Sequence, residues 1–159
     1  EKEKISKAVG IGALKYFILK EHKNTDIAFD WWKILDFKGD SGPYLQYTYA
    51  RLAGIKKKAG EKGESDFSVL GKDVELSLMK KMIKFPEILV EVAKNNFPNT
   101  LTLYLYELGG LTNKFYESVP VIQEKEEKVR NARLGLIDLV NKILEKGLNL
   151  LGIEILERI

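Results

Sequence analysis

The chain has 159 residues, of which 45% are hydrophobic, and this is enough for one domain with its own core. Its formal net charge of +3 does not by itself demand a nucleic-acid partner, and the absence of cysteine excludes disulfide and thiol chemistry. No apolar run approaches the roughly 18 residues of a membrane span, and no signal-peptide pattern opens the chain. We therefore expect a cytoplasmic protein without a membrane partner.

Residues 3–20 predict a first helix. One face of it should carry Ile5, Val9, Gly12, Tyr16 and Leu19. Glycine disfavours a helix interior, so the glycines of this segment indicate a close backbone approach by a neighbouring element.

Residues 21–40 predict a connection that contains a short helix and much apolar bulk. The bulky side chains are Phe29, Trp31, Trp32, Ile34, Leu35 and Phe37. We expect them to form a small satellite core that clamps the connection to the bundle. Two adjacent tryptophans cannot share one helix face, so one of them should be more exposed.

The next helix begins with a clear start signal, because Ser41 can cap it and Pro43 suits its first turn. It should continue to about Lys58. Tyr44, Tyr47 and Arg51 fall within about one sixth of a turn on a helical wheel. Tyrosines at helical spacing are usually packing residues, but two rings beside a guanidinium also suit the unstacked bases of single-stranded RNA. The pattern alone leaves both interpretations open.

Four further helices are predicted, over residues 73–84, 86–95, 98–118 and 124–151. The first should turn Val74, Leu78, Met82 and Ile83 inward, and the helix over 98–118 is apolar nearly all round and should be central. Arg133 lies inside the apolar stripe of the last helix, which predicts a buried ion pair. The fold class is thus all-α, a bundle of about five helices with a short N-terminal attachment.

Several segments, in order, resemble one family. Gly42-Pro43-Tyr44-Leu45-Gln46-Tyr47 with Tyr49-Ala50-Arg51 resembles the start of the anticodon-binding domain of arginyl-tRNA synthetases, and Glu157-Arg158-Ile159 resembles its end. The resemblance implies that residues 1–40 are the end of the catalytic or stem-contact region plus a linker. Residues 41–159 would be the anticodon-binding bundle. The family's Asp-Ala-Leu-Arg signature has only a reordered counterpart, Asn131-Ala132-Arg133-Leu134, and we carry no function over from it.

The resemblance also implies a function, which is recognition of the anticodon loop of arginine tRNA on behalf of a catalytic domain that this chain lacks. The implied RNA-binding residues are Tyr44, Tyr47, Arg51, Asn113, Tyr116 and Ile159. The tyrosines at 44 and 47 would stack or pack against nucleotides, Arg51 would contact a base edge or phosphate, and Tyr116 would form the opposite wall. The family often ends in methionine, so Ile159 departs from its pattern.

We expect no catalysis by this chain and no cofactor, since the adenylation motifs of class I synthetases are absent; the parent enzyme would use ATP. The lone His22 lacks the clustered ligands of a metal site. An alternative function is a helical interaction module without RNA binding, because residues 5–37 would expose apolar bulk without the catalytic domain, and the fragment would then self-associate. Generic RNA binding through Lys56, Lys57 and Lys58 is a third hypothesis.

Overall fold

The computed structural model describes residues 1–61 and 63–159, and within them the fold is all-helical. The elements are α1 (Lys2–Leu19), α2 (Trp31–Ile34), α3 (Gly42–Ala59), the 3-10 turn η1 (Phe67–Val69), α4 (Asp73–Ile83), α5 (Phe85–Asn95), α6 (Pro98–Ser118) and α7 (Glu127–Leu150). The last five α-helices form the predicted bundle, so the expected fold class is confirmed. No helix of these described residues is long and apolar enough to cross a membrane.

Local sequence signals set the helix boundaries. Pro43, Pro86 and Pro98 each occupy the first turn of a helix, where the missing N–H costs nothing. α5 ends at Asn96 in the left-handed conformation, with φ of 54°, and Gly152 takes φ of 68° just after α7. These residue types tolerate that conformation best, which is why the helices stop there.

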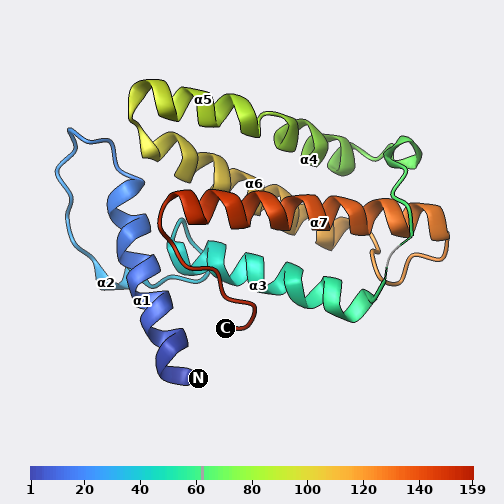
Figure 1. Ribbon diagram of the computed structural model, residues 1–159, viewed down its shortest axis with the longest axis horizontal. Coiled ribbons are helices and arrows are strands. Elements are labelled where there is room, and N and C mark those ends of the chain that lie inside the picture. Colours follow the sequence, from blue (N-terminus) through green and yellow to red (C-terminus); the bar gives the residue numbers. More distant parts are fainter. Residues whose placement is uncertain (62) are drawn as a thin grey trace.

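α6 and α7 form the centre of the bundle. Figure 1 shows α7 running alongside α6, with α4 and α5 on one side and α3 on the other, while α1 crosses one end at a steep angle. α6 contacts α1, α3, α4, α5 and α7, as its apolar sequence predicts. The fully buried side chains of the two central helices include Leu105, Leu108, Phe115, Leu136, Ile137, Val140, Leu144 and Leu148.

α1 packs on α3 through backbone contact at two glycines. A Cβ added to Gly42 would lie 2.6 Å from the carbonyl oxygen of Gly12, so α3 could not carry a larger residue there without moving away from α1. This confirms the expected close approach at Gly12, whereas Gly10 has no neighbour within 4 Å of its Cβ position. The steep crossing also corrects the predicted buried face. Gly12 and Tyr16 are buried as predicted, but Ile5, Val9 and Leu19 stay partly exposed, and Ala8, Ala13 and Phe17 are buried in their place.

The aromatic segment 29–37 does not form the expected satellite core. Only Ile34 is buried there, against Ala13 and Phe17 of α1. Trp31 is 63% exposed and Trp32 is 90% exposed, which confirms that the two tryptophans differ but contradicts the predicted clamp. α2 has only four residues, too short to present a whole apolar face to the bundle, so most of these side chains remain on the surface.

Two other sequence expectations were tested by packing. Ile83, predicted to point inward, is 75% exposed because it follows Met82 by one residue and is turned about 100° away from the face that buries Leu78 and Met82. Arg133 does form the predicted buried ion pairs. Its Nε lies 2.7 Å from a carboxylate oxygen of the buried Glu75, and its Nη1 lies 2.5 Å from Glu124 and donates to the carbonyl of Pro120.

Candidate nucleic-acid interface

The first turn of α3 positions the residues on which the candidate interface depends. The Ser41 hydroxyl accepts a hydrogen bond from the Tyr44 amide at 3.2 Å and donates its own proton to the carbonyl of Asp36. The cap therefore fixes where the helix begins, and the rotation of every later residue follows from that start. Tyr44, Tyr47 and Arg51 emerge from successive turns on neighbouring faces.

Tyr44 is buried, which corrects the expectation of two open rings. Its side chain is 8% exposed, and its ring meets Tyr106 of α6 edge-on at 5.6 Å between centroids. Gly109 leaves the space, since its Cβ position would lie 3.2 Å from the Tyr44 ring. Burial raises the pKa of the Tyr44 hydroxyl, and the hydrogen bond from Asn113 opposes that rise. The Tyr44 ring is thus packed against α6 and is not open for stacking on a base.

Asn113 of α6 joins Tyr44 to Arg51. Its Nδ2 donates to the Tyr44 hydroxyl at 2.9 Å, and its Oδ1 accepts from Nη1 of Arg51 at 3.4 Å. The Arg51 guanidinium lies over the ring of Tyr116 at 4.8 Å, a cation–π contact. Tyr116 follows Asn113 by three residues on α6, so both reach the same side of α3.

Tyr47 supplies the exposed ring of this face. Its side chain is 46% exposed, and the ring meets Phe37 edge-on at 6.5 Å between centroids. Tyr47 precedes Arg51 by four residues on α3, so the ring and the guanidinium lie one above the other along the helix. A flat exposed ring beside a planar cation can stack on a base and donate hydrogen bonds to its edge or to a phosphate.

The segment after α7, residues 151–159, returns to α3. In Figure 1 it leaves the end of α7 and runs back past the first half of α3. A groove of about 450 Å³ lies between α3, α7 and this segment; its lining residues are Tyr49, Ala53, Gly54, Lys56, Lys57, Asn141, Glu157 and Arg158. Ile159, at the end of the segment, is 43% exposed.

The structure therefore brings together four of the six predicted residues, namely Tyr44, Arg51, Asn113 and Tyr116. Tyr47 lies one turn after Tyr44 on α3 but does not join the hydrogen-bonded set. For Ile159 the structure gives only the course of its segment along α3 (Figure 1). Sequence reasoning missed Tyr106 and Phe37, the edge-on partners of the two tyrosines. The only available signal for Tyr106 was its spacing on the helix, since it lies one turn before Gly110 and two turns before Asn113.

The cations near this face differ in their partners. Lys56 forms an ion pair with Asp138 of α7 at 2.5 Å, so its charge is partly neutralised. Lys57 lines the groove, and Lys57 and Lys58 are both exposed at the end of α3. Exposed lysines can contact a phosphate backbone, but this alone carries no sequence specificity.

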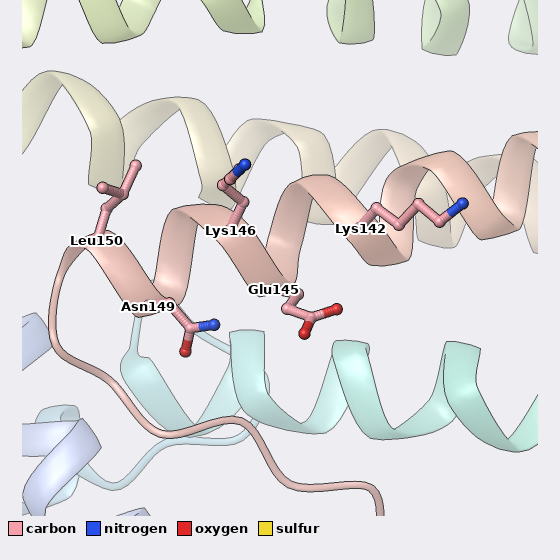
Figure 2. Close-up of a pocket in the computed structure, with 5 residues that line it drawn as sticks. All are labelled: Lys142, Glu145, Lys146, Asn149 and Leu150. Carbon is pink, nitrogen blue, oxygen red and sulfur yellow. The ribbon is translucent and has the colours of Figure 1, made fainter.

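A second hollow, of about 540 Å³, lies elsewhere on the molecule. Figure 2 shows its five lining residues, all on α7: Lys142, Lys146 and Leu150 rise on one side of the helix, and Glu145 and Asn149 descend on the other. Side chains from a single helix cannot enclose a ligand, and none of the predicted site residues belongs to this hollow.

The fold is that of a helical anticodon-binding domain of the kind that aminoacyl-tRNA synthetases contain. The family model described as the DALR anticodon binding domain matches residues 45–159. The chain belongs to the DALR anticodon-binding domain family. This confirms the resemblance noted from the sequence, although the signature that names the family is reordered in this chain.

Individual relatives agree with this assignment. Arginine–tRNA ligase of Citrobacter koseri is 43% identical over 99% of this chain, and that of Vibrio parahaemolyticus is 42% identical over the same share. The chain spans 28% of the length of both. Among solved structures, Thermus thermophilus arginyl-tRNA synthetase superposes with a TM-score of 0.95 at 33% identity, covering 100% of this chain and 28% of that one. The Plasmodium falciparum enzyme gives 0.83 at 28% identity, over 98% and 28%.

Proposed function

We propose that this chain binds the anticodon loop of an arginine tRNA through the face formed by α3 and α6. The observation that carries the proposal is the joined set of Tyr44, Asn113, Arg51 and Tyr116, with the exposed ring of Tyr47 beside it. The family assignment supports binding to an anticodon, and the names of the relatives support arginine tRNA. The oligomerisation module considered from the sequence gains no support from the comparisons.

We assign each residue a role in that binding. Tyr47 stacks on a splayed nucleotide, and Arg51 donates to a base edge or a phosphate. Tyr116 holds the guanidinium flat from behind, while Tyr44 and Asn113 fix its distance from α3. Ile159 completes the surface from the other side. The two planar groups of Tyr47 and Arg51 then read the middle anticodon base, a cytosine.

The rest of an arginine–tRNA ligase is the second proposed partner. Residues 1–40 act as the attachment, and the exposed apolar side chains of α1 and the aromatic segment pack against the catalytic domain. These side chains are Ile11, Leu14, Ile18, Phe29, Trp31 and Trp32. The amino-acid activation and the use of ATP belong to that other part of the enzyme, in the cytoplasm.

A titration with matched RNA stem-loops tests the proposal. The wild-type chain is titrated with an arginine-tRNA anticodon stem-loop and with one that differs only at the middle base. A good bidentate base contact contributes about 1–3 kcal/mol to discrimination, so the cognate RNA should bind about 10-fold more tightly or better. Equal affinity for every stem-loop supports charge-driven binding by the lysines instead. No binding to any RNA rejects the proposal.

A further inference from the structure

Gln46 stands between Tyr44 and Tyr47 in the sequence, but its side chain points into the protein toward α1 and the segment after α7. Its side chain is fully buried, yet it is polar. Its Nε2 donates to the carbonyl of Ala8 on α1 at 3.3 Å and to the carbonyl of Glu154, after α7, at 2.8 Å. One amide group on α3 therefore connects two segments that are far apart in the sequence.

The orientation of this amide is determined by its partners. Turning the group over would place Oε1 against two carbonyl oxygens, all of them acceptors, so the amide nitrogen must face them. Oε1 itself is the one buried side-chain polar atom without a hydrogen-bond partner in the described part of the chain. An unpaired buried oxygen lowers the stability of the protein. The two hydrogen bonds that the amide donates are therefore the only favourable polar interactions that offset this cost.

Gly12 shapes the pocket that holds the amide. A Cβ at position 12 would lie 2.8 Å from Nε2 and 3.0 Å from Oε1 of Gln46. The amide reaches the Ala8 carbonyl only because α1 has no side chain at this point. Gly12 on α1 and Gln46 on α3 therefore fit each other, because the missing side chain of the glycine leaves room for the amide.

The segment that Gln46 holds runs back along α3, the helix that also carries Tyr47 and Arg51 (Figure 1). Lys15 of α1 donates to the carbonyl of Gly152, so α1 contacts the start of the segment directly as well as through Gln46. Ile153 and Leu156 are then buried, and Glu157 and Arg158 line the groove along α3. The position of the last residues thus depends on where the Glu154 carbonyl is held.

We propose that Gln46 is a positioning residue for RNA binding. By holding the Glu154 carbonyl against α1 and α3, it sets the place of residues 155–159 along α3, the helix that also presents Tyr47 and Arg51. It does not touch the RNA. The inference rests on the proposed function, because it concerns the same face, and it adds that the segment must be held in place for that face to bind.

The test replaces Gln46 with methionine, which has a similar length and no donor. We expect amide hydrogen exchange at residues 153–158 to become about 10-fold faster and the affinity for the arginine-tRNA stem-loop to fall about 10-fold. Affinity is measured far below the urea midpoint, where nearly all molecules are folded. A loss of stability alone would leave it unchanged under those conditions.

Three further variants keep the test decisive. Gly12→Ala should reproduce both changes by displacing the amide, and Gly10→Ala, with open space around it, should cause neither. Lys15→Met removes the other contact between α1 and the segment from an exposed position, so it should loosen the segment in a protein that still folds.

Unchanged exchange in Gln46→Met overturns the proposal, as does unchanged affinity in a variant whose segment exchanges faster. A wild-type chain that binds no stem-loop rejects the proposed function itself.

Discussion

Asn113 shows how a single side chain can join two helices and fix the residues of a candidate binding surface. One end of its amide holds the Tyr44 hydroxyl and the other end holds Arg51. The guanidinium has five N–H donors, and Asn113 takes one of them while Tyr116 covers a face of the plane. The remaining donors are therefore held in a defined orientation, which under the proposed function would lower the entropic cost of binding RNA.

The first prediction concerns the exposed ring of Tyr47. Tyr47→Ala removes a stacking surface worth about 1–3 kcal/mol, so the affinity for the arginine-tRNA stem-loop should fall about 10-fold or more. Tyr47→Phe keeps the ring and should bind within about 2-fold of the wild type. Fluorescence titrations of both variants measure this. If Tyr47→Ala binds like Tyr47→Phe, stacking on this residue is refuted.

A second prediction concerns Arg133, which pairs with the buried Glu75 and with the partly exposed Glu124. Arg133→Met leaves Glu75 buried without its charged partner and should lower the free energy of unfolding by about 3–5 kcal/mol. Arg130→Met, which removes only a bond to the Glu124 carbonyl, should cost about 1 kcal/mol. Urea unfolding of the two variants gives the comparison. Equal losses of the free energy of unfolding would mean that the buried ion pair stabilises the fold no more than a single hydrogen bond does.

At the scale of the helices, short-range signals predicted most of the fold. Ser41 with Pro43, and Pro98 alone, mark the starts of α3 and α6, and the structure uses each as predicted. The apolar character of α6 also predicted its central place. A helical wheel tells which side chains share a face, but not whether a neighbour covers that face. This is why the aromatic segment 29–37 was wrongly expected to be buried.

A third prediction uses two glycines on the central helices. A Cβ at Gly147 of α7 would lie 2.5 Å from the fully buried Leu105 of α6, so Gly147→Ala forces the helices apart. Overpacking costs about 1–3 kcal/mol and outweighs the gain of about 1 kcal/mol in helix propensity. Gly110→Ala has open space and should gain that propensity. Thermal unfolding should thus show a lower midpoint for the first variant and a higher one for the second; a higher midpoint for both would contradict the close packing.

At the scale of the whole molecule, the candidate interface combines parts that are distant in the sequence. Tyr44 and Arg51 come from α3, and Asn113 and Tyr116 come from α6, more than sixty residues later. The resemblance named these residues, but neither their hydrogen bonds nor the burial of Tyr44 could be predicted from periodicity. Those features depend on how α6 lies against α3 and on the space that Gly109 leaves.

The fourth prediction concerns alkaline pH. Burial raises the pKa of Tyr16, Tyr44 and Tyr49, and raises that of Tyr104 to about 12. The unfolded chain releases these protons near pH 10, whereas the folded chain keeps them, so the stabilisation is complete below about pH 10 and is lost as the pH rises above it. Each such tyrosine adds a slope of about 1.4 kcal/mol per pH unit.

Urea unfolding between pH 8 and pH 12 measures this effect. The free energy of unfolding should fall above pH 10, and the Tyr104→Phe variant should show a shallower fall. Tyr104→Phe also loses the bond to the Lys81 carbonyl, so it should start about 1 kcal/mol less stable at pH 8. A slope identical to that of the wild type would show that the Tyr104 proton is not retained by folding.

The contacts of Gln46 and Lys15 have a consequence for synthesis of the protein on the ribosome. Both side chains belong to the first third of the chain, but the carbonyls that they hold are those of Glu154 and Gly152. A nascent chain emerges in order, so α1 and α3 must wait with these donors unpaired while the rest is translated. The native packing of α1 can be completed only after residue 154 has left the exit tunnel.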